Sequence, residues 1–307
     1  MRLAFVQTLI KLAEKDKNVW LVTGDLGFSV FEGFKERFPE QYLNVGVAEQ
    51  NLIGTAAGLA LAGKRPFVYS ITTFATMRPY EQIRNDVCYQ NLPVVIIGGG
   101  STFSYSTFGC THMPFEDFAL MRVLPHMAVL SPGDPLEVRE LIHRAYERGG
   151  PAYMRIAKKG EPAVHQKGVS IELGKSVEVR AGTDASIIVT GRQLPSALAA
   201  AELLQKKGVN VRVLSMHTIK PLDEEAIVRA AEETGAMVTC EEHSIIGGLG
   251  SAVAEVLMRR GVALPFATIG VTDEFPNGVG SQDFFLKQYG LTPEGIAERV
   301  RSIYARK

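Results

Sequence analysis

The chain has 307 residues, enough for two domains that each bury a hydrophobic core. Its 33 basic and 33 acidic side chains cancel, so the overall charge indicates no surface for nucleic acid and no basic arm for a membrane, and we expect small molecules or proteins as partners. Hydrophobic residues make up 46% of the chain, but they never form the roughly 20 consecutive apolar residues that a membrane span needs.

Strands and helices are predicted to alternate through the first half of the chain. Apolar residues recur at helical spacing over 3–15, and a short apolar run at 19–23 then predicts a buried strand. Further strands are expected at 66–70, 93–97, 128–130 and 152–156, with helices at 48–62, 79–90 and 134–147. Such an alternation is typical of a mostly parallel sheet with helices on both faces.

The pattern is interrupted between about 157 and 183, where glycines and Pro162 divide a poorly periodic stretch. A second alternation follows, with strands expected at 185–190, 209–214, 237–241 and 267–271 and helices at 194–207, 223–234, 250–260 and 292–305. We therefore expect two three-layer α/β/α domains, at 1–165 and 183–307, joined by a linker at 166–182.

A carboxylate, Glu49, stands at the start of the apolar helix predicted at 48–62. The helix is so rich in Gly and Ala that another backbone can approach it closely, which suits a subunit interface. Glu49 would then be buried and would need a hydrogen-bonding partner, because burying an unpaired carboxylate is costly. The alternative is an exposed Glu in the first turn, where the helix dipole favours it.

Two further segments could carry chemistry. His112 lies in a Gly-containing loop after a parallel strand, where α/β proteins place reactive groups, although a lone loop histidine more often makes local hydrogen bonds. Phe74, Met77 and Tyr80 have the spacing of one side of a helical turn and could hold a flat heterocycle, although core packing is the usual reason for such a stripe.

The cysteines and the N-terminus bear on the compartment. Cys88, Cys110 and Cys240 are far apart and lack the spacing of a metal site or a disulfide framework, so no metal is expected on this chain. The first residues lead directly into a charged amphipathic pattern that does not resemble a secretory signal. A reducing cytoplasm is therefore the expected location.

Four segments, taken in order and spacing, resemble the transketolase family. The first is 45–50, which contains Glu49, and the second is the loop of Thr111 and His112. The third consists of 124–127 together with 131–134, and the fourth is the Gly-rich segment 241–250. The resemblance covers essentially the whole chain and implies a pyrimidine-binding domain followed by a smaller transketolase C-terminal-like domain.

The resemblance implies thiamine diphosphate as the cofactor. The glutamate that matches Glu49 hydrogen-bonds a ring nitrogen of the aminopyrimidine, the ring of Phe74 would stack on the pyrimidine, and Met77 and Tyr80 would help to wall its pocket. Asp25 would support the cofactor or the domain interface. The alternative is that it makes a local hydrogen bond within its turn.

It also implies a substrate site. His112 would face the sugar donor as a hydrogen-bond donor or proton shuttle. Arg2, Ser29 and Lys158 match phosphate-contacting positions, and Lys158 stands where Arg is usual, which weakens the case for a bidentate contact.

The chain lacks the family's diphosphate motif, a Gly-Asp-Gly followed by an Asn pair, and Gly24-Asp25-Leu26-Gly27 does not replace it. Mg²⁺ and the diphosphate are therefore expected on a partner, a separately encoded N-terminal subunit, in an α2β2 assembly that dimerises through the helix near Glu49. The expected reaction moves a two-carbon ketol unit from a ketose, expected to be a sugar phosphate, to an aldose.

Three positions depart from the family. Phe108 replaces an acidic residue four positions before His112, Gly100 replaces a sugar-binding His, and Gln50 stands where His is usual. These changes favour an unusual, branched or modified sugar. The competing interpretations are a beta subunit of a 2-oxo acid dehydrogenase, half of a 1-deoxyxylulose-5-phosphate synthase, and a non-catalytic scaffold subunit with the same fold.

Overall fold

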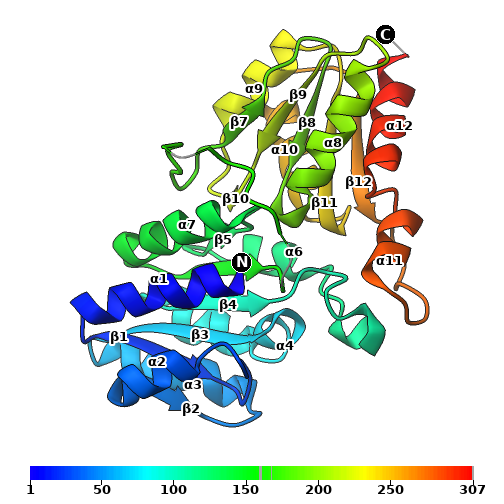
Figure 1. The fold of residues 1–307 in the computed structure, drawn as a ribbon. Coiled ribbons are helices and arrows are strands. Elements are labelled where there is room, and N and C mark those ends of the chain that lie inside the picture. The colour runs from blue at the N-terminus through cyan, green and yellow to red at the C-terminus, as the bar shows by residue number, and fades with distance from the viewer. Residues whose placement is uncertain (159–160, 167, 306–307) are drawn as a thin grey trace.

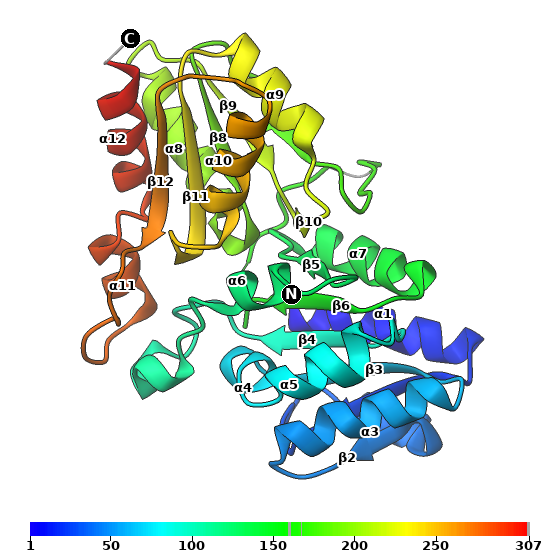
Figure 2. The same cartoon turned by 180° about the vertical axis from the view of Figure 1, so that it is seen from behind.

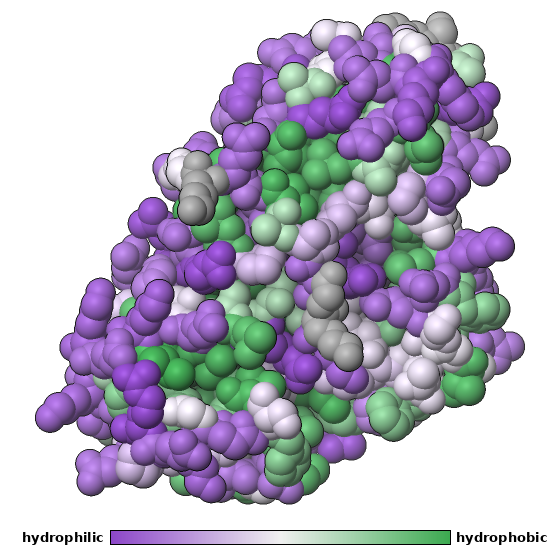
Figure 3. All heavy atoms as spheres, in the orientation of Figure 1, coloured by the Kyte–Doolittle hydropathy of each residue, from purple (hydrophilic) through white to green (hydrophobic). Residues whose placement is uncertain are grey.

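The computed structural model describes residues 1–158, 161–166 and 168–305. Figures 1 and 2 show two sheets, one above the other, each with helices on both faces, and an N-terminus near the middle of the molecule. Most of the face in Figure 3 is hydrophilic, with hydrophobic side chains gathered in separate patches over both halves. Within the described residues, no helix is both long enough and apolar enough to cross a membrane.

The first sheet has seven strands in the order β10-β5-β6-β4-β3-β1-β2. Neighbouring strands pair in parallel, except that β10 is antiparallel to β5. The strands are β1 (Val19–Thr23), β2 (Tyr42–Asn44), β3 (Arg65–Ile71), β4 (Val95–Gly99), β5 (Ala128–Leu130), β6 (Ala152–Ile156) and β10 (Thr218–Lys220). Their central members are buried on both faces, which explains why they are continuous apolar runs.

Helices cover both faces of this sheet. One core cluster joins α1 (Arg2–Lys15) and α7 (Pro135–Arg148) to the sheet, and a second lies under α3 (Glu49–Leu61), α6 (Asp117–Arg122) and the π-helix Ile83–Cys88. The ends of α7 follow from sequence: the Asp134 carboxylate caps the first turn, and Gly149 adopts the left-handed conformation after the last. Shorter elements are α2 (Glu32–Arg37), α4 (Thr72–Thr76), α5 (Tyr80–Gln82) and the 3-10 turns Pro39–Gln41, Ser106–Phe108 and Cys110–His112.

The second sheet has five strands in the order β12-β11-β8-β9-β7, with only β7 antiparallel. They are β7 (Val177–Arg180), β8 (Ala185–Val189), β9 (Val211–Ser215), β11 (Met237–Ser244) and β12 (Phe266–Val271). α8 (Leu194–Gln205) and α12 (Pro293–Tyr304) cover one face, and α9 (Glu224–Glu233) and α10 (Leu249–Arg259) the other. The 3-10 turn Gly191–Gln193 and α11 (Gln282–Gln288) complete the described elements. The predicted fold class is confirmed.

Three strands are missing from the sequence prediction, and one of them is β2 at the edge of the first sheet. The predicted linker at 166–182 contains β7, which pairs with β9 of the second sheet. β10 comes from the second half of the chain, yet it adds to the edge of the first sheet by pairing with β5. All three strands are short and lie at sheet edges, so hydrophobic periodicity gives them little signal. The division of the chain at 165 and 183 stays a proposal.

Candidate active site at the edge of the first sheet

The loops that follow β1, β2, β3, β4 and β6 lie at one edge of the first sheet, because the carboxyl ends of parallel strands meet there. This edge collects the side chains that the sequence singles out: Asp25 and Ser29 after β1, Glu49 after β2, Phe74, Met77 and Tyr80 after β3, His112 after β4 and Lys158 after β6. Arg2 joins them from the start of α1, where its Nε donates to the Lys158 carbonyl oxygen at 2.8 Å.

Glu49 opens α3, and only 4% of it is exposed. Its Oε2 accepts a hydrogen bond from Nη1 of Arg78 at 3.1 Å, which forms an ion pair between a buried carboxylate and an arginine whose side chain is 55% exposed. The alternative of an exposed carboxylate in the first turn is therefore wrong. The chain buries Glu49 by itself, and Arg78 supplies the partner that a buried carboxylate needs.

The Arg78 guanidinium packs against the first of a row of rings. Its guanidinium carbon lies 4.5 Å from the centroid of the Phe74 ring, and that centroid lies 5.0 Å from the His112 ring in an edge-on arrangement. The His112 ring lies 5.3 Å from Phe108, which is 64% exposed. The structure thus brings Glu49, Phe74 and His112 into one continuous row.

The row ends in positive charge. The Tyr105 and Phe108 centroids lie 6.5 Å apart, and Nζ of Lys158 lies 4.5 Å from the centroid of Tyr105. Burial raises the pKa of the Tyr105 hydroxyl, and the nearby charge of Arg2 opposes that rise. A ligand along this row would meet a buried carboxylate at one end and two cations at the other.

Met77 and Tyr80 are less closely connected to the row. The single helical stripe expected for Phe74, Met77 and Tyr80 is divided, since α4 ends at Thr76 and α5 begins only at Tyr80. Pro79 accounts for the break, because it has no N–H to continue the ladder. The Tyr80 hydroxyl donates to the Leu120 carbonyl oxygen at 2.9 Å, and its ring packs against the core. Met77 is 36% exposed.

Asp25 and Ser29 occupy an exposed turn, each with a positive φ, 59° and 61°. The Asn44 side chain accepts from the Asp25 N–H at 2.9 Å and donates to the Asp25 carboxylate at 3.1 Å. The Ser29 N–H donates to Oε1 of Glu32 at 2.7 Å. The Asp25 carboxylate thus bonds to a side chain 19 positions away and not to the backbone of its own turn, whereas the bond of Ser29 is local. Short polar side chains such as these tolerate the left-handed conformation.

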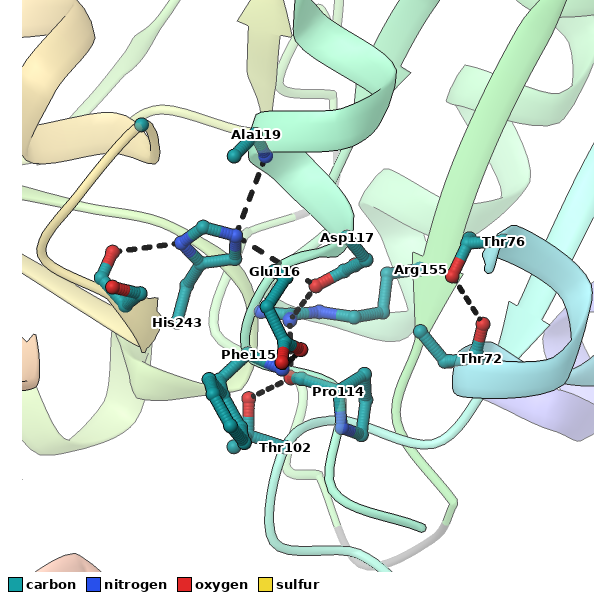
Figure 4. A network of polar contacts seen from close by, with 12 residues as sticks. Thr72, Thr76, Thr102, Pro114, Phe115, Glu116, Asp117, Ala119, Arg155 and His243 are labelled. Carbon is teal, nitrogen blue, oxygen red and sulfur yellow. Dashed lines mark hydrogen bonds and ion pairs between the residues drawn. The ribbon is translucent and has the colours of Figure 1, made fainter. Parts of the chain in front are cut away.

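The loop that carries His112 is fixed near both of its ends, where Figure 4 shows the Thr102 hydroxyl pointing toward Pro114. The Thr102 hydroxyl lies within hydrogen-bonding distance of two carbonyl oxygens, that of Pro114, at 2.6 Å, and that of Glu242 in β11. Arg155, from β6, donates to the same two oxygens, at 3.5 Å and 2.8 Å. Residues 102–114 are therefore held at both ends by groups that also bind β11.

Arg155 belongs to a buried polar cluster between the two sheets. It donates to the Asp117 carboxylate at 2.9 Å, which also accepts from the Tyr153 hydroxyl at 2.6 Å. The Phe118 ring lies between Arg155, 3.8 Å away, and His243, with which it stacks at 5.0 Å. Burial lowers the pKa of His243 to about 4, which keeps it neutral beside the guanidinium.

Sequence reasoning missed the roles of Arg78, Tyr105 and Arg155. A signal existed for Arg78 alone, because a buried carboxylate requires a donor. No group of three or more His, Cys, Asp or Glu side chains among the described residues could hold a metal ion.

Residues 1–161 match the model of the transketolase pyrimidine binding domain, and residues 174–296 match that of the transketolase C-terminal domain. The chain belongs to the transketolase family. A 6-deoxy-6-sulfo-D-fructose transketolase subunit from Clostridium sp. (strain MSTE9) is 38% identical over 100% of this chain and 95% of that protein. An apulose-4-phosphate transketolase subunit from Phocaeicola vulgatus is 38% identical over 97% of this chain and 95% of that protein.

A solved structure extends the likeness to the fold. A split-gene transketolase, described as an inactive beta4 tetramer, is 38% identical, with a TM-score of 0.89 over 98% of this chain and 97% of that one. The prediction of a split transketolase subunit is confirmed, and such subunits are transferases that act together with a partner subunit.

Proposed function

We propose that this chain forms one half of a two-chain ketol-transfer site and moves a two-carbon unit from a ketose phosphate to an aldose acceptor. The supporting observation is the row that runs from the buried Glu49 through Phe74 and His112 to Arg2 and Lys158. The pairing of a carboxylate that is 4% exposed with an arginine whose side chain is 55% exposed supports a ligand site over a scaffold subunit.

The residues present fit the pyrimidine end of thiamine diphosphate. Glu49 would hydrogen-bond the ring, and Phe74, with Met77 and Tyr80 nearby, would pack against its face. When bound, this cofactor supplies the nucleophilic carbon that receives the ketol unit. Glu49 would hold the proton that it shares with the ring, and His112 would exchange a proton with the sugar hydroxyl or carbonyl that reaches its ring.

The diphosphate and Mg²⁺ would be bound by a separately encoded N-terminal subunit in an α2β2 assembly. The absence from the sequence of a Gly-Asp-Gly motif followed by an Asn pair supports this division. So does the likeness to a structure described as an inactive beta4 tetramer, which is consistent with activity that requires a second kind of chain. We propose the cytoplasm as the location, because the chain's three cysteines are free.

The sugar would be unusual. Phe108, which is 64% exposed beside His112, offers no hydrogen bond to a hydroxyl group. Two relatives carry names that refer to a sulfonated deoxyketose and to apulose 4-phosphate. A branched or modified ketose is therefore the proposed donor.

The test is to purify this chain with the product of the neighbouring gene and to measure ketol transfer with thiamine diphosphate, Mg²⁺ and a panel of ketoses. Activity should require both chains and should disappear in the Glu49→Gln variant. Glu36→Gln, at an exposed position on α2, is the matched control and should leave the rate unchanged. A stable complex that transfers nothing from any ketose but consumes a 2-oxo acid would contradict the proposal.

A further inference from the structure

The ring of Tyr105 packs directly against the backbone of Gly100. Gly100 has φ of 106°, and a Cβ atom built on it would lie 2.6 Å and 2.9 Å from two carbons of the Tyr105 ring. Such distances are far below van der Waals contact, so the ring and a side chain at position 100 exclude one another. The ring of Tyr105 therefore occupies the space that a side chain at position 100 would need.

Tyr105 and Phe108 together form what we call the aromatic wall. The wall stands between the imidazole of His112, 5.3 Å from Phe108, and the ammonium of Lys158, 4.5 Å from Tyr105. Tyr105 is half-buried, whereas Phe108 is 64% exposed. A large exposed apolar ring beside a polar reactive group is more typical of a ligand surface than of packing.

The chemistry of the wall restricts what can lie against it. An aromatic face accepts C–H groups, but it cannot satisfy a hydroxyl, and a hydroxyl forced against it loses its hydrogen bonds to water. Arg2 and Lys158 at the far end favour an anionic group. The surface thus suits a sugar whose anionic end reaches Arg2 and Lys158 and whose carbon chain presents C–H groups to the two aromatic rings.

We propose that the aromatic wall determines which ketose is used: it selects a sugar with an anionic end whose intervening carbon, being deoxygenated or branched, presents C–H groups to Tyr105 and Phe108. This inference rests on the proposed function and narrows its substrate class. Arg2 and Lys158 would bind the anion, and Tyr105 and Phe108 would discriminate among carbon chains that carry it.

The variants to compare, in the two-chain enzyme, are Tyr105→Val, Tyr105→Phe and Phe108→Asp, with Tyr89→Val as the matched control at a tyrosine that is 86% exposed. The measurement is kcat/KM for xylulose 5-phosphate, fructose 6-phosphate and a set of deoxy and branched ketose phosphates. Tyr105→Val should lose at least about tenfold with the preferred donor, and Tyr105→Phe, which keeps the ring, should stay within about threefold. Phe108→Asp should shift the preference toward xylulose 5-phosphate by at least about tenfold, because the new carboxylate accepts from a hydroxyl.

Unchanged ratios of kcat/KM across the panel in both Tyr105→Val and Phe108→Asp would overturn the inference. Calorimetric titration of the complex with the same ketose phosphates provides a readout that does not need turnover. If the wild-type complex transfers nothing, the proposed function fails. A loss of discrimination between ketose phosphates in the binding of these two variants would still support the selective role of the aromatic wall. Binding that is equal for all donors in the wild type would refute it.

Discussion

Breaking the buried pair of Arg155 and Asp117 on one side should lower the stability of the chain strongly. The Arg155 side chain is 3% exposed and that of Asp117 is 0% exposed, so replacing Arg155 with Met leaves a buried carboxylate that keeps the hydrogen bond from the Tyr153 hydroxyl but loses its guanidinium. Breaking a buried ion pair on one side costs about 3–5 kcal/mol, because the surviving charge has lost its solvation and its partner. Two further bonds, to the carbonyl oxygens of Pro114 and Glu242, are lost as well.

The assay is urea unfolding of Arg155→Met, followed by far-ultraviolet circular dichroism and compared with Arg144→Met. Arg144 pairs with Glu147 on the surface, with side chains 42% and 59% exposed, so its loss should cost less than about 1 kcal/mol. Adding Asp117→Asn to Arg155→Met should recover part of the stability, since it removes the unpaired charge. A loss in Arg155→Met no larger than that in Arg144→Met would refute this reasoning.

Three further outcomes are expected. Glu49→Gln should reduce ketol transfer by at least about a hundredfold with an unchanged circular dichroism spectrum, and normal turnover would contradict the role of Glu49. His112→Ala should lower kcat more than cofactor affinity, as measured by titration with thiamine diphosphate, and an unchanged rate would return His112 to a local structural role. Burial raises the pKa of Glu241 from 4.5 to about 7, so this group lowers the free energy of unfolding as pH rises from 4.5 to 7. Burial lowers the pKa of His243 from 6.5 to about 4, so this group raises the free energy of unfolding as pH rises from 4 to 6.5. Glu241→Gln removes the first effect, so its free energy of unfolding should rise more steeply from about pH 4 to 6.5 than that of the parent, and an unchanged slope would count against these assignments.

The sequence predicts the layers of this fold well because central parallel strands are buried on both faces and become unbroken apolar runs. β4 and β8 are examples, and every residue in both is buried. β10, by contrast, has only three residues and pairs antiparallel with a strand almost ninety positions earlier. Its place depends on tertiary contact, which local periodicity does not encode.

The candidate site, like the fold, has a part that the sequence predicts and a part that depends on tertiary contacts. Glu49, Phe74 and His112 can be identified from a family resemblance, and the parallel sheet then explains why they meet at one edge. The groups that hold them depend on long-range contacts. Arg155 reaches Asp117 across 38 positions and the Glu242 carbonyl oxygen across 87, and the Thr102 hydroxyl meets that oxygen across 140.

These long-range contacts connect the second sheet to the chemistry of the first. Because Thr102 and Arg155 both bind the carbonyl oxygens of Pro114 and Glu242, hydrogen bonds link β11 directly to the loop that carries His112. The aromatic wall belongs to the same loop, and the Ser106 hydroxyl donates to the Gly280 carbonyl oxygen at 2.8 Å, just before α11. The second sheet and the segment before α11 therefore help to position the loop that carries His112, although the row from Glu49 to Lys158 lies at the edge of the first sheet.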